Sequence, residues 1–367
     1  MENKRHFSAP GRVEIGGNHT DHQHGRVLAA AVELYMKCSA EPNGTDIVHI
    51  RSECFGDDTV DLSDLSVCES EKGTPAALVR GVAAWLVEHG HEVGGFDVNI
   101  SSDVPIGSGL SSSAAFEVLI GNVFCGLFNL EITPLEIAIA GQYAENVYFG
   151  KPCGLMDQCA SSFGGLVMID FADPKNPVVT PIQTDFSGYS MCVVATGGSH
   201  ADLTPDYAAI PGEMKTVAAF FGKDHLREVP PDEFYAEFGK LRHLSDRALL
   251  RAVHFFGDNE RVSKQADALK CGDMRAFLEL VNESGRSSLN YLQNVFSSKN
   301  PEEQGLTLAL ALSERILSGR GAWRVHGGGF AGTILAFVPD DLKVEYQKRM
   351  NEVFGDGCCR FLNITTP

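Results

Sequence analysis

A segment rich in glycine and serine, between an expected strand and an expected helix, most constrains how this chain folds. Residues 96–100 are predicted to form a strand, and the apolar run 114–128 is long enough for a buried helix. Backbone N–H groups of a small-residue loop at the start of a helix bind phosphate, because the helix dipole favours an anion there. The predicted phosphate loop comprises Gly107, Ser108, Gly109, Leu110, Ser111, Ser112 and Ser113. A flexible turn capped by serine is the alternative interpretation.

Two common nucleotide motifs do not fit the sequence. The phosphate loop lacks the lysine of Gly-x-x-x-x-Gly-Lys-Ser/Thr, which argues against a Walker-type site. Gly327, Gly329 and Gly332 match Gly-x-Gly-x-x-Gly, but residues 333–338 look like a strand. A dinucleotide-binding turn opens a helix, so a tight hairpin is the better interpretation here.

The remaining pattern predicts an α+β protein. Strands are expected at 47–51, 166–171, 322–326 and 333–338, and helices at 76–88, 134–148, 247–262, 274–281 and 341–354. A chain of 367 residues exceeds the length at which one hydrophobic core stops growing, about 250–300 residues. We therefore expect an N-terminal domain at 1–187 and a C-terminal domain at 188–367, meeting at a cleft.

Composition points to small-molecule partners. The net charge of -18 disfavours nucleic acid and anionic lipid, and we see no sign of an obligate protein partner. The start of the chain has no signal-peptide core, and no run approaches the roughly 20 apolar residues of a membrane span. The ten cysteines include no Cys-x-x-Cys pair, which favours reduced thiols and a cytoplasmic protein.

A cluster of polar residues near the N-terminus has several interpretations. His19, Asp21, His22 and His24 lie close enough in sequence to suggest zinc, but flanking glycines indicate a loop rather than a ligand-bearing helix. A polar surface turn is the plain alternative. The wider context favours neither of these two interpretations.

The stretch Ala-Pro-Gly-Arg-Val-Glu-Ile-Gly-Gly-Asn-His-Thr-Asp-His from position 9 resembles the galactokinase signature of the GHMP kinase superfamily, usually Ala-Pro-Gly-Arg-Val-Asn-Leu-Ile-Gly-Glu-His-Thr-Asp-Tyr. The phosphate loop, the segment 144–158 and the turn 327–332 resemble three further superfamily motifs, in the family's order and spacing. The resemblance covers nearly the whole chain. It implies a two-domain GHMP kinase fold and a kinase that uses ATP and Mg²⁺ to phosphorylate the anomeric hydroxyl of galactose or a galactose-like sugar.

The resemblance also implies roles for individual residues. Asp157 is the expected catalytic carboxylate, with Arg12 beside it to keep it ionised. Ser113 and Glu145 match the Mg²⁺ ligands, and two protein oxygens suit an ion that keeps much of its hydration shell. The expected sugar-binding residues are Asn18, His19, Thr20, Asp21, Gly154 and Tyr207.

Three departures from the family pattern affect the substrate. Asn18 replaces the usual glutamate, His22 replaces the usual tyrosine, and two arginines after Tyr207 are missing. Replacing a charged acceptor by an amide costs about 1–3 kcal/mol, so a uronic acid or an amino sugar competes with galactose as the expected substrate. Two different kinds of function also compete with a kinase, namely a non-catalytic sugar-sensing paralogue and a structural protein.

Overall fold

The computed structural model describes residues 4–105, 107, 109–184, 186–198 and 203–366, and the chain divides into two compact units. The first unit consists of Met1–Arg12, Ala31–Gly165 and Ile364–Pro367, and the second consists of Val13–Ala30 and Leu166–Asn363. Two of the four boundaries fall inside the strands β1 (Arg5–Gly16) and β2 (Arg26–Pro42), which therefore contribute to both units. The expected domain division at residue 187 stays a prediction.

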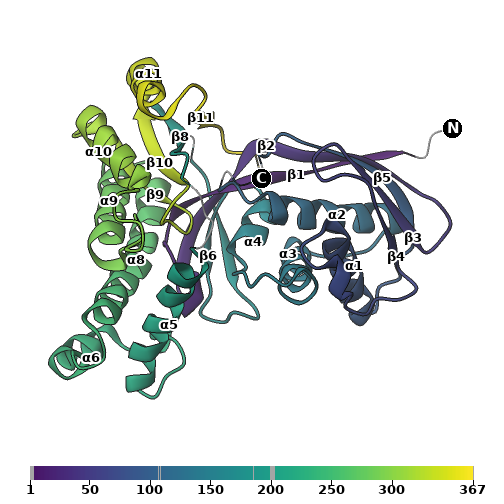
Figure 1. The fold of residues 1–367 in the computed structure, drawn as a ribbon, viewed down its shortest axis with the longest axis horizontal. Coiled ribbons are helices and arrows are strands. Elements are labelled where there is room, and N and C mark those ends of the chain that lie inside the picture. The colour runs from purple at the N-terminus through teal and green to yellow at the C-terminus, as the bar shows by residue number, and fades with distance from the viewer. Residues whose placement is uncertain (1–3, 106, 108, 185, 199–202, 367) are drawn as a thin grey trace. The chain divides into compact units, whose positions relative to one another are not determined.

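In the first unit, helices cover one face of a sheet (Figure 1). The strand order is β4-β3-β5-β2, and β1 pairs with β2. The strands are β3 (Ile47–Ser52), β4 (Asp58–Asp61) and β5 (Phe96–Ser102), and the helices are α1 (Pro75–Glu88), α2 (Ser112–Phe128), α3 (Pro134–Tyr143) and α4 (Met156–Phe163). This mixture of helices and a sheet confirms the predicted α+β class.

Burial of aromatic and aliphatic side chains explains why these elements form. Phe96 of β5 packs edge-on against Phe124 of α2, with ring centroids 5.1 Å apart, and Trp85 of α1 lies in the same core. Burying an aromatic side chain contributes about 1.5–3 kcal/mol, which fixes α2 against the sheet. The phosphate loop is therefore attached at both ends to buried elements, as the sequence predicts.

The second unit combines two groups of strands with a set of long helices. Residues 26–30 of β2 pair with β6 (Leu166–Asp170), which pairs with β7 (Val178–Ile182). A separate antiparallel sheet has the order β11-β8-β10-β9. Its strands are β8 (Tyr189–Ala195), β9 (Ala322–His326), β10 (Thr333–Pro339) and β11 (Cys359–Leu362).

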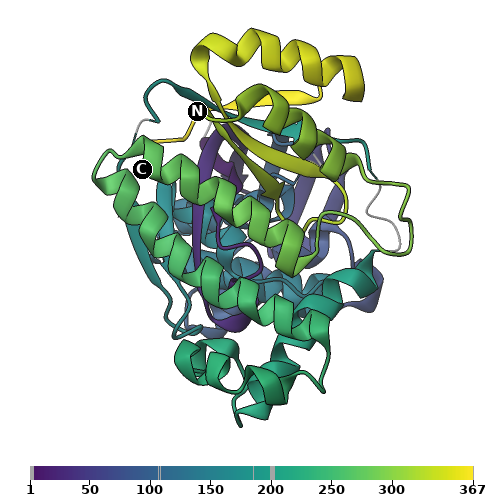
Figure 2. The ribbon, with the colours of Figure 1, turned by 90° about the vertical axis from the view of Figure 1, so that its left-hand side faces the viewer.

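Helices make up most of the rest of this unit. They are α5 (Thr204–Phe220), α6 (Pro231–Ala236), α7 (Phe238–Leu241), α8 (Asp246–Lys270), α9 (Met274–Ser287), α10 (Gly305–Leu317) and α11 (Lys343–Phe354). The green α8 and α9 lie side by side (Figure 2). Within the described part of the chain, no helix combines the length and apolar character needed to cross a membrane.

Candidate active site

The phosphate loop is shaped by residues with left-handed backbone conformations. Gly107 and Gly109 have φ of 72° and 74°, a region that glycine reaches without strain, and Ser111 also has a positive φ. Ser111 precedes the first residue of α2 but makes no side-chain cap bond to it. The first N–H groups of α2 therefore lack a side-chain acceptor from the cap residue and suit an incoming anion. Ser108 of the predicted loop lies outside the described residues.

Arg12 and Asp157 form an ion pair at this loop. Nε of Arg12 donates to Oδ1 of Asp157 at 2.6 Å, and Nη2 donates to Oδ2 at 2.8 Å. Nη1 of the same guanidinium donates to the carbonyl oxygen of Gly109 at 2.5 Å, and the hydroxyl of Ser111 donates to Asp157. One arginine thus holds the carboxylate and the phosphate loop together, which brings the two predicted catalytic residues into contact.

The surroundings of Asp157 keep its side chain ionised. Burial alone would raise the pKa of this carboxyl group, but the charge and hydrogen bonds of Arg12, with a further bond from Ser111, lower it below the ordinary value. Asp157 also lies in the first turn of α4, where the helix dipole favours a negative charge. A carboxylate of this kind attracts a hydroxyl proton and orients the hydroxyl, although it is a weak base.

Glu145 lies in the π-helical turn η3 (Ala144–Phe149) and is buried. Its Oε1 accepts hydrogen bonds from Ser113 at 3.2 Å and from Lys151 at 3.0 Å. The predicted metal ligands Ser113 and Glu145 therefore meet at the start of α2. Among the described residues, no group of three or more His, Cys, Asp or Glu side chains is arranged to hold a metal ion. One carboxylate and one hydroxyl fit Mg²⁺, which takes few protein oxygens and completes its shell with phosphates and water.

A second buried glutamate, which the sequence analysis missed, lies behind this group. Nε2 of Gln158 donates to Glu117 Oε2 at 2.9 Å and to Glu145 Oε2 at 3.1 Å. Burial first, and then the charge of Glu145, raise the pKa of Glu117 well above its ordinary value. Oε1 of Glu117 and Oε1 of Gln158 are buried with no donor among the described residues. A proton on Glu117 supplies the missing donor, so we infer that this side chain is neutral.

The neutral state of Glu117 leads to a prediction about pH. A carboxyl group whose pKa is raised by folding destabilises the folded protein as pH rises above its unfolded value of 4.5. A glutamine side chain in place of Glu117 cannot ionise, and its oxygen can still accept the hydrogen bond from the amide of Gln158. We therefore expect Glu117→Gln to gain stability relative to the wild type by up to about 1.4 kcal/mol per pH unit between about pH 5 and pH 7. Urea unfolding at several pH values measures this difference.

A matched control with the opposite sign lies in the same unit. Hydrogen bonds from Thr133 lower the pKa of Glu136, which caps α3, so ionised Glu136 stabilises the fold above pH 4.5. Glu136→Gln is therefore expected to lose stability relative to the wild type as pH rises through about 4.5, and this loss should stay constant between about pH 5 and pH 7. If Glu117→Gln behaves like Glu136→Gln, the neutral assignment of Glu117 is wrong.

In the second unit, three predicted sugar-site residues contact the same glycine turn between β9 and β10. Nδ2 of Asn18 donates to the carbonyl oxygen of Gly327 at 2.7 Å, and Nε2 of His19 lies 2.9 Å from the Gly328 oxygen. The hydroxyl of Tyr207 donates to the oxygen of Gly329 at 2.8 Å. Side chains from two distant parts of the sequence thus hold three successive carbonyl groups of this turn. β9 and β10 pair in antiparallel fashion on either side of this turn, which confirms the predicted hairpin.

Asn18 is fully buried, and its side chain is surrounded by hydrogen-bonding partners. Besides Gly327, its Nδ2 donates to Glu14 Oε1 at 2.9 Å, and its Oδ1 accepts from Asn294 at 2.8 Å. Oε1 of Glu14 also accepts a 2.7 Å bond from Nη2 of Arg324, a side chain with 0% exposure. Glu14 and Arg324 were not predicted. Together they position Asn18, a predicted sugar-site residue, against the glycine turn between β9 and β10.

The other predicted sugar-site residues have distinct surroundings. Thr20 is buried and donates to the carbonyl oxygen of Gly17 at 2.8 Å, which closes the turn after β1. Asp21 begins the short helix η1 (Asp21–Gln23), with Nε2 of His22 3.9 Å from its Oδ1. Burial first, and then the charge of His22, lower the pKa of His19 to about 3, so His19 is neutral at physiological pH. Gly154 lies in the first unit, just before α4.

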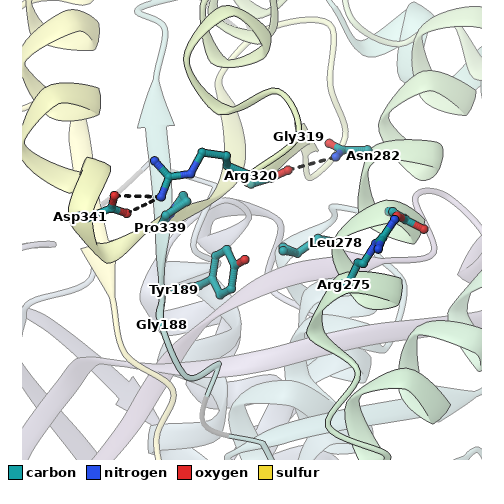
Figure 3. Close-up of a pocket in the computed structure, with 11 residues that line it drawn as sticks. Gly188, Tyr189, Arg275, Leu278, Asn282, Gly319, Arg320, Pro339 and Asp341 are labelled. Atoms are coloured by element: carbon teal, nitrogen blue, oxygen red, sulfur yellow. Dashed lines mark hydrogen bonds and ion pairs between the residues drawn. The ribbon is translucent and has the colours of Figure 1, made fainter.

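A surface cavity of about 740 Å³ in the second unit is separate from these residues. Figure 3 shows Tyr189 beside it, and Arg320 bound to both carboxylate oxygens of Asp341 at 2.9 and 2.8 Å. Arg275, the other arginine that lines the cavity, donates to Glu279 at 3.1 Å. Both cations are therefore neutralised locally, and the lining contains none of the predicted site residues. We assign this cavity no part in the reaction.

Comparison with protein families matches two regions of the chain. Residues 77–165 match the GHMP kinases N-terminal domain, and residues 2–42 match the galactokinase galactose-binding signature. The first region contains the phosphate loop and Asp157, and the second contains Arg12 and Asn18. The two family matches thus fall on the segments described above.

Individual proteins extend the similarity to most of the chain. This chain is 33% identical over 349 residues to a galactokinase of Glaesserella parasuis, and the match covers 93% of this chain and 87% of the relative. A galactokinase of Actinobacillus pleuropneumoniae is 34% identical over 344 residues, with the same coverage of 93% and 87%.

Solved structures show the same relationship in three dimensions. The Lactococcus lactis galactokinase, solved in complex with galactose, aligns with a TM-score of 0.85 at 25% identity, covering 100% of this chain and 94% of that one. A Methanococcus jannaschii mevalonate kinase shares the fold, with a TM-score of 0.70 at 17% identity and coverage of 99% of both chains. The protein has the GHMP kinase fold and belongs to the galactokinase family.

Proposed function

We propose that this protein transfers the γ-phosphate of ATP to the anomeric hydroxyl of galactose. The observation that carries the proposal is the contact of Arg12 with both Asp157 and the phosphate loop at Gly109. A carboxylate fixed beside a loop that suits phosphate is the arrangement that phosphoryl transfer to an alcohol requires, because positioning and electrostatics supply most of the catalysis. Membership of the galactokinase family supports the sugar as the acceptor.

The reaction joins the C1 oxygen of the sugar to the γ-phosphorus while the bond to the bridging oxygen of ADP breaks. Asp157 accepts a hydrogen bond from the C1 hydroxyl and attracts its proton, which passes by way of the carboxylate to water as the new oxygen–phosphorus bond forms. Because the pKa of Asp157 is lowered, its contribution is mainly to orient and polarise the hydroxyl. Arg12 stabilises the negative charge that develops on the transferred group.

Ser113 and Glu145 are proposed to hold Mg²⁺, which neutralises phosphate charge when it is bound. The donor set supports this assignment, since both side chains present oxygen atoms at the start of α2. For the sugar, we propose contacts with His19, Asp21, Gly154 and Tyr207. We propose that Asn18 and Thr20 also serve sugar binding, because each hydrogen-bonds to a neighbouring turn and holds it in place.

A sugar panel tests the proposal. Purified protein with MgATP is supplied separately with galactose, glucose, galacturonic acid and galactosamine, and ADP release is measured. We expect kcat/KM for galactose to exceed that for each other sugar by at least about tenfold, since buried polar groups penalise a mismatched hydroxyl. Phosphorus NMR identifies the phosphate on C1.

The panel also separates galactose from the competing substrates and functions. Faster turnover of galacturonic acid or galactosamine would make the substrate assignment wrong and leave the kinase assignment standing. ATP binding without ADP release on any of the four sugars would instead favour a sugar-sensing paralogue. We also propose a cytoplasmic location, which the ten free cysteines support.

A further inference from the structure

The phosphate loop lacks a lysine of its own, but the structure places one beside it. Lys151 follows η3, and its backbone N–H donates to the carbonyl oxygen of Glu145 at 3.1 Å. Its Nζ donates to Oε1 of Glu145, the same atom that accepts from Ser113. The ammonium group therefore lies at the start of α2, where the phosphate loop ends.

The charges around Lys151 explain why a cation is needed at this point. Glu145 and Asp157 are two acidic side chains close to the expected position of a polyanionic nucleotide, and like charges repel. Arg12 already donates from Nε, Nη1 and Nη2 to protein atoms. The ammonium group of Lys151 forms an ion pair with Glu145, with Nζ 3.0 Å from Oε1. Lys151 is therefore suited to offset the repulsion.

The side chain of Lys151 also has freedom to move. It is 62% exposed, while Glu145 is 3% exposed. A lysine is a point charge on a flexible stem with three donors, so it can keep one bond to Glu145 and offer another to a phosphate oxygen. A lysine whose only role was to stabilise the fold would not need a side chain that is so exposed to solvent.

We propose that Lys151 is a phosphate-binding residue of the ATP site. It neutralises Glu145 before nucleotide binds and donates to an oxygen of the terminal phosphates afterwards. This supplies, from a different loop, the ammonium group that Walker-type sites carry within the phosphate loop. The inference rests on the proposed function, because it assumes that ATP binds at Gly107–Ser113.

The competing explanation is that Lys151 acts only as the counter-ion of Glu145. A double-mutant cycle separates the two, because Glu145→Gln removes the charge that a counter-ion would serve. ATP binding is measured by calorimetry in EDTA, without sugar or metal, for the wild type, Lys151→Met, Glu145→Gln and the double variant. The rise in unfolding temperature at millimolar ATP is the second readout, because it detects weak binding.

We expect Lys151→Met to weaken ATP binding by about tenfold or more in both backgrounds, since a charge-assisted hydrogen bond to phosphate is lost in each. A matched control is Lys264→Met. Lys264 is 60% exposed and paired with Glu260 on α8, so ATP affinity should stay within about twofold of the wild type.

Three results would overturn the role of Lys151 or the proposed function, and they are distinguishable. If Lys151→Met weakens binding in the wild-type background but changes it less than twofold in Glu145→Gln, the lysine is a counter-ion only. If Lys151→Met changes ATP affinity less than twofold in both backgrounds, the lysine is likewise a counter-ion only. If the wild-type protein itself binds no ATP with or without Mg²⁺, the proposed function is wrong.

Discussion

Asp157→Asn is expected to reduce kcat by about 10²- to 10⁴-fold while ATP affinity changes by less than about threefold. This loss of kcat is the size expected when a positioned proton-transfer group is removed. The amide that replaces the carboxylate can neither attract the hydroxyl proton nor balance the charge of Arg12. ATP affinity is retained because Asp157 is itself an anion and does not attract phosphate. A coupled assay of ADP release gives kcat, and calorimetry gives the affinity for ATP.

A second aspartate provides the control for lost pairing with arginine. Asp170 binds Arg26 at 2.7 Å and Arg227 at 2.9 Å in the second unit. Asp170→Asn therefore also breaks charged pairs, and it should change kcat by less than about threefold because it lies outside the candidate site. Near-normal turnover of Asp157→Asn would show that the catalytic role given to this carboxylate is wrong. An equal loss in both variants would point to general damage.

Arg324→Met is expected to lower the free energy of unfolding by about 3–5 kcal/mol. Arg324 is fully buried, and its Nη1 and Nη2 donate at 2.7 Å to the carbonyl oxygen of Ile15 and to Glu14. Removing the guanidinium takes a cation away from the buried carboxylate of Glu14, which is costly in a medium of low dielectric constant. Denaturant unfolding measures the loss. KM for the sugar should rise as well, because Asn18 and the glycine turn depend on Glu14.

The partner variant and an exposed arginine sharpen this test. Adding Glu14→Gln to Arg324→Met also removes the buried negative charge, so the double variant should be more stable than Arg324→Met alone. Arg320, 51% exposed and bound to Asp341, is the matched control, and Arg320→Met should cost about 0–1 kcal/mol. Equal losses for Arg324→Met and Arg320→Met would contradict the importance given to the buried pair.

Local patterns made much of the fold predictable. The helix at 114–128 and the hairpin around 327–332 depend on neighbours in sequence, and the structure has both. β1 and β2 were not predicted as strands. Residues 27–32 of β2 are fully buried on both faces, so they lack the alternation of apolar and polar residues that reveals a half-buried strand.

The unpredicted members of the candidate site depend on contacts between distant residues. Glu14 and Arg324 are 310 residues apart in sequence, and neither has a local pattern that identifies its partner. Glu117 gave one signal, a single acid within an apolar helix, and Gln158 follows Asp157 directly. Family resemblance identified the residues expected to meet the substrates, whereas the supporting side chains became visible only in three dimensions.

The path of the chain limits how this protein can be dissected. The polypeptide passes from one unit to the other at 12/13, 30/31, 165/166 and 363/364, so neither unit is a continuous stretch of sequence. Truncating the chain from either end would remove strands from one unit and leave unpaired strand edges in the other, and unpaired edges promote aggregation. Isolating either half would require rejoining its segments in a new order, and a proteolytic nick within β1 or β2 should impair both halves together.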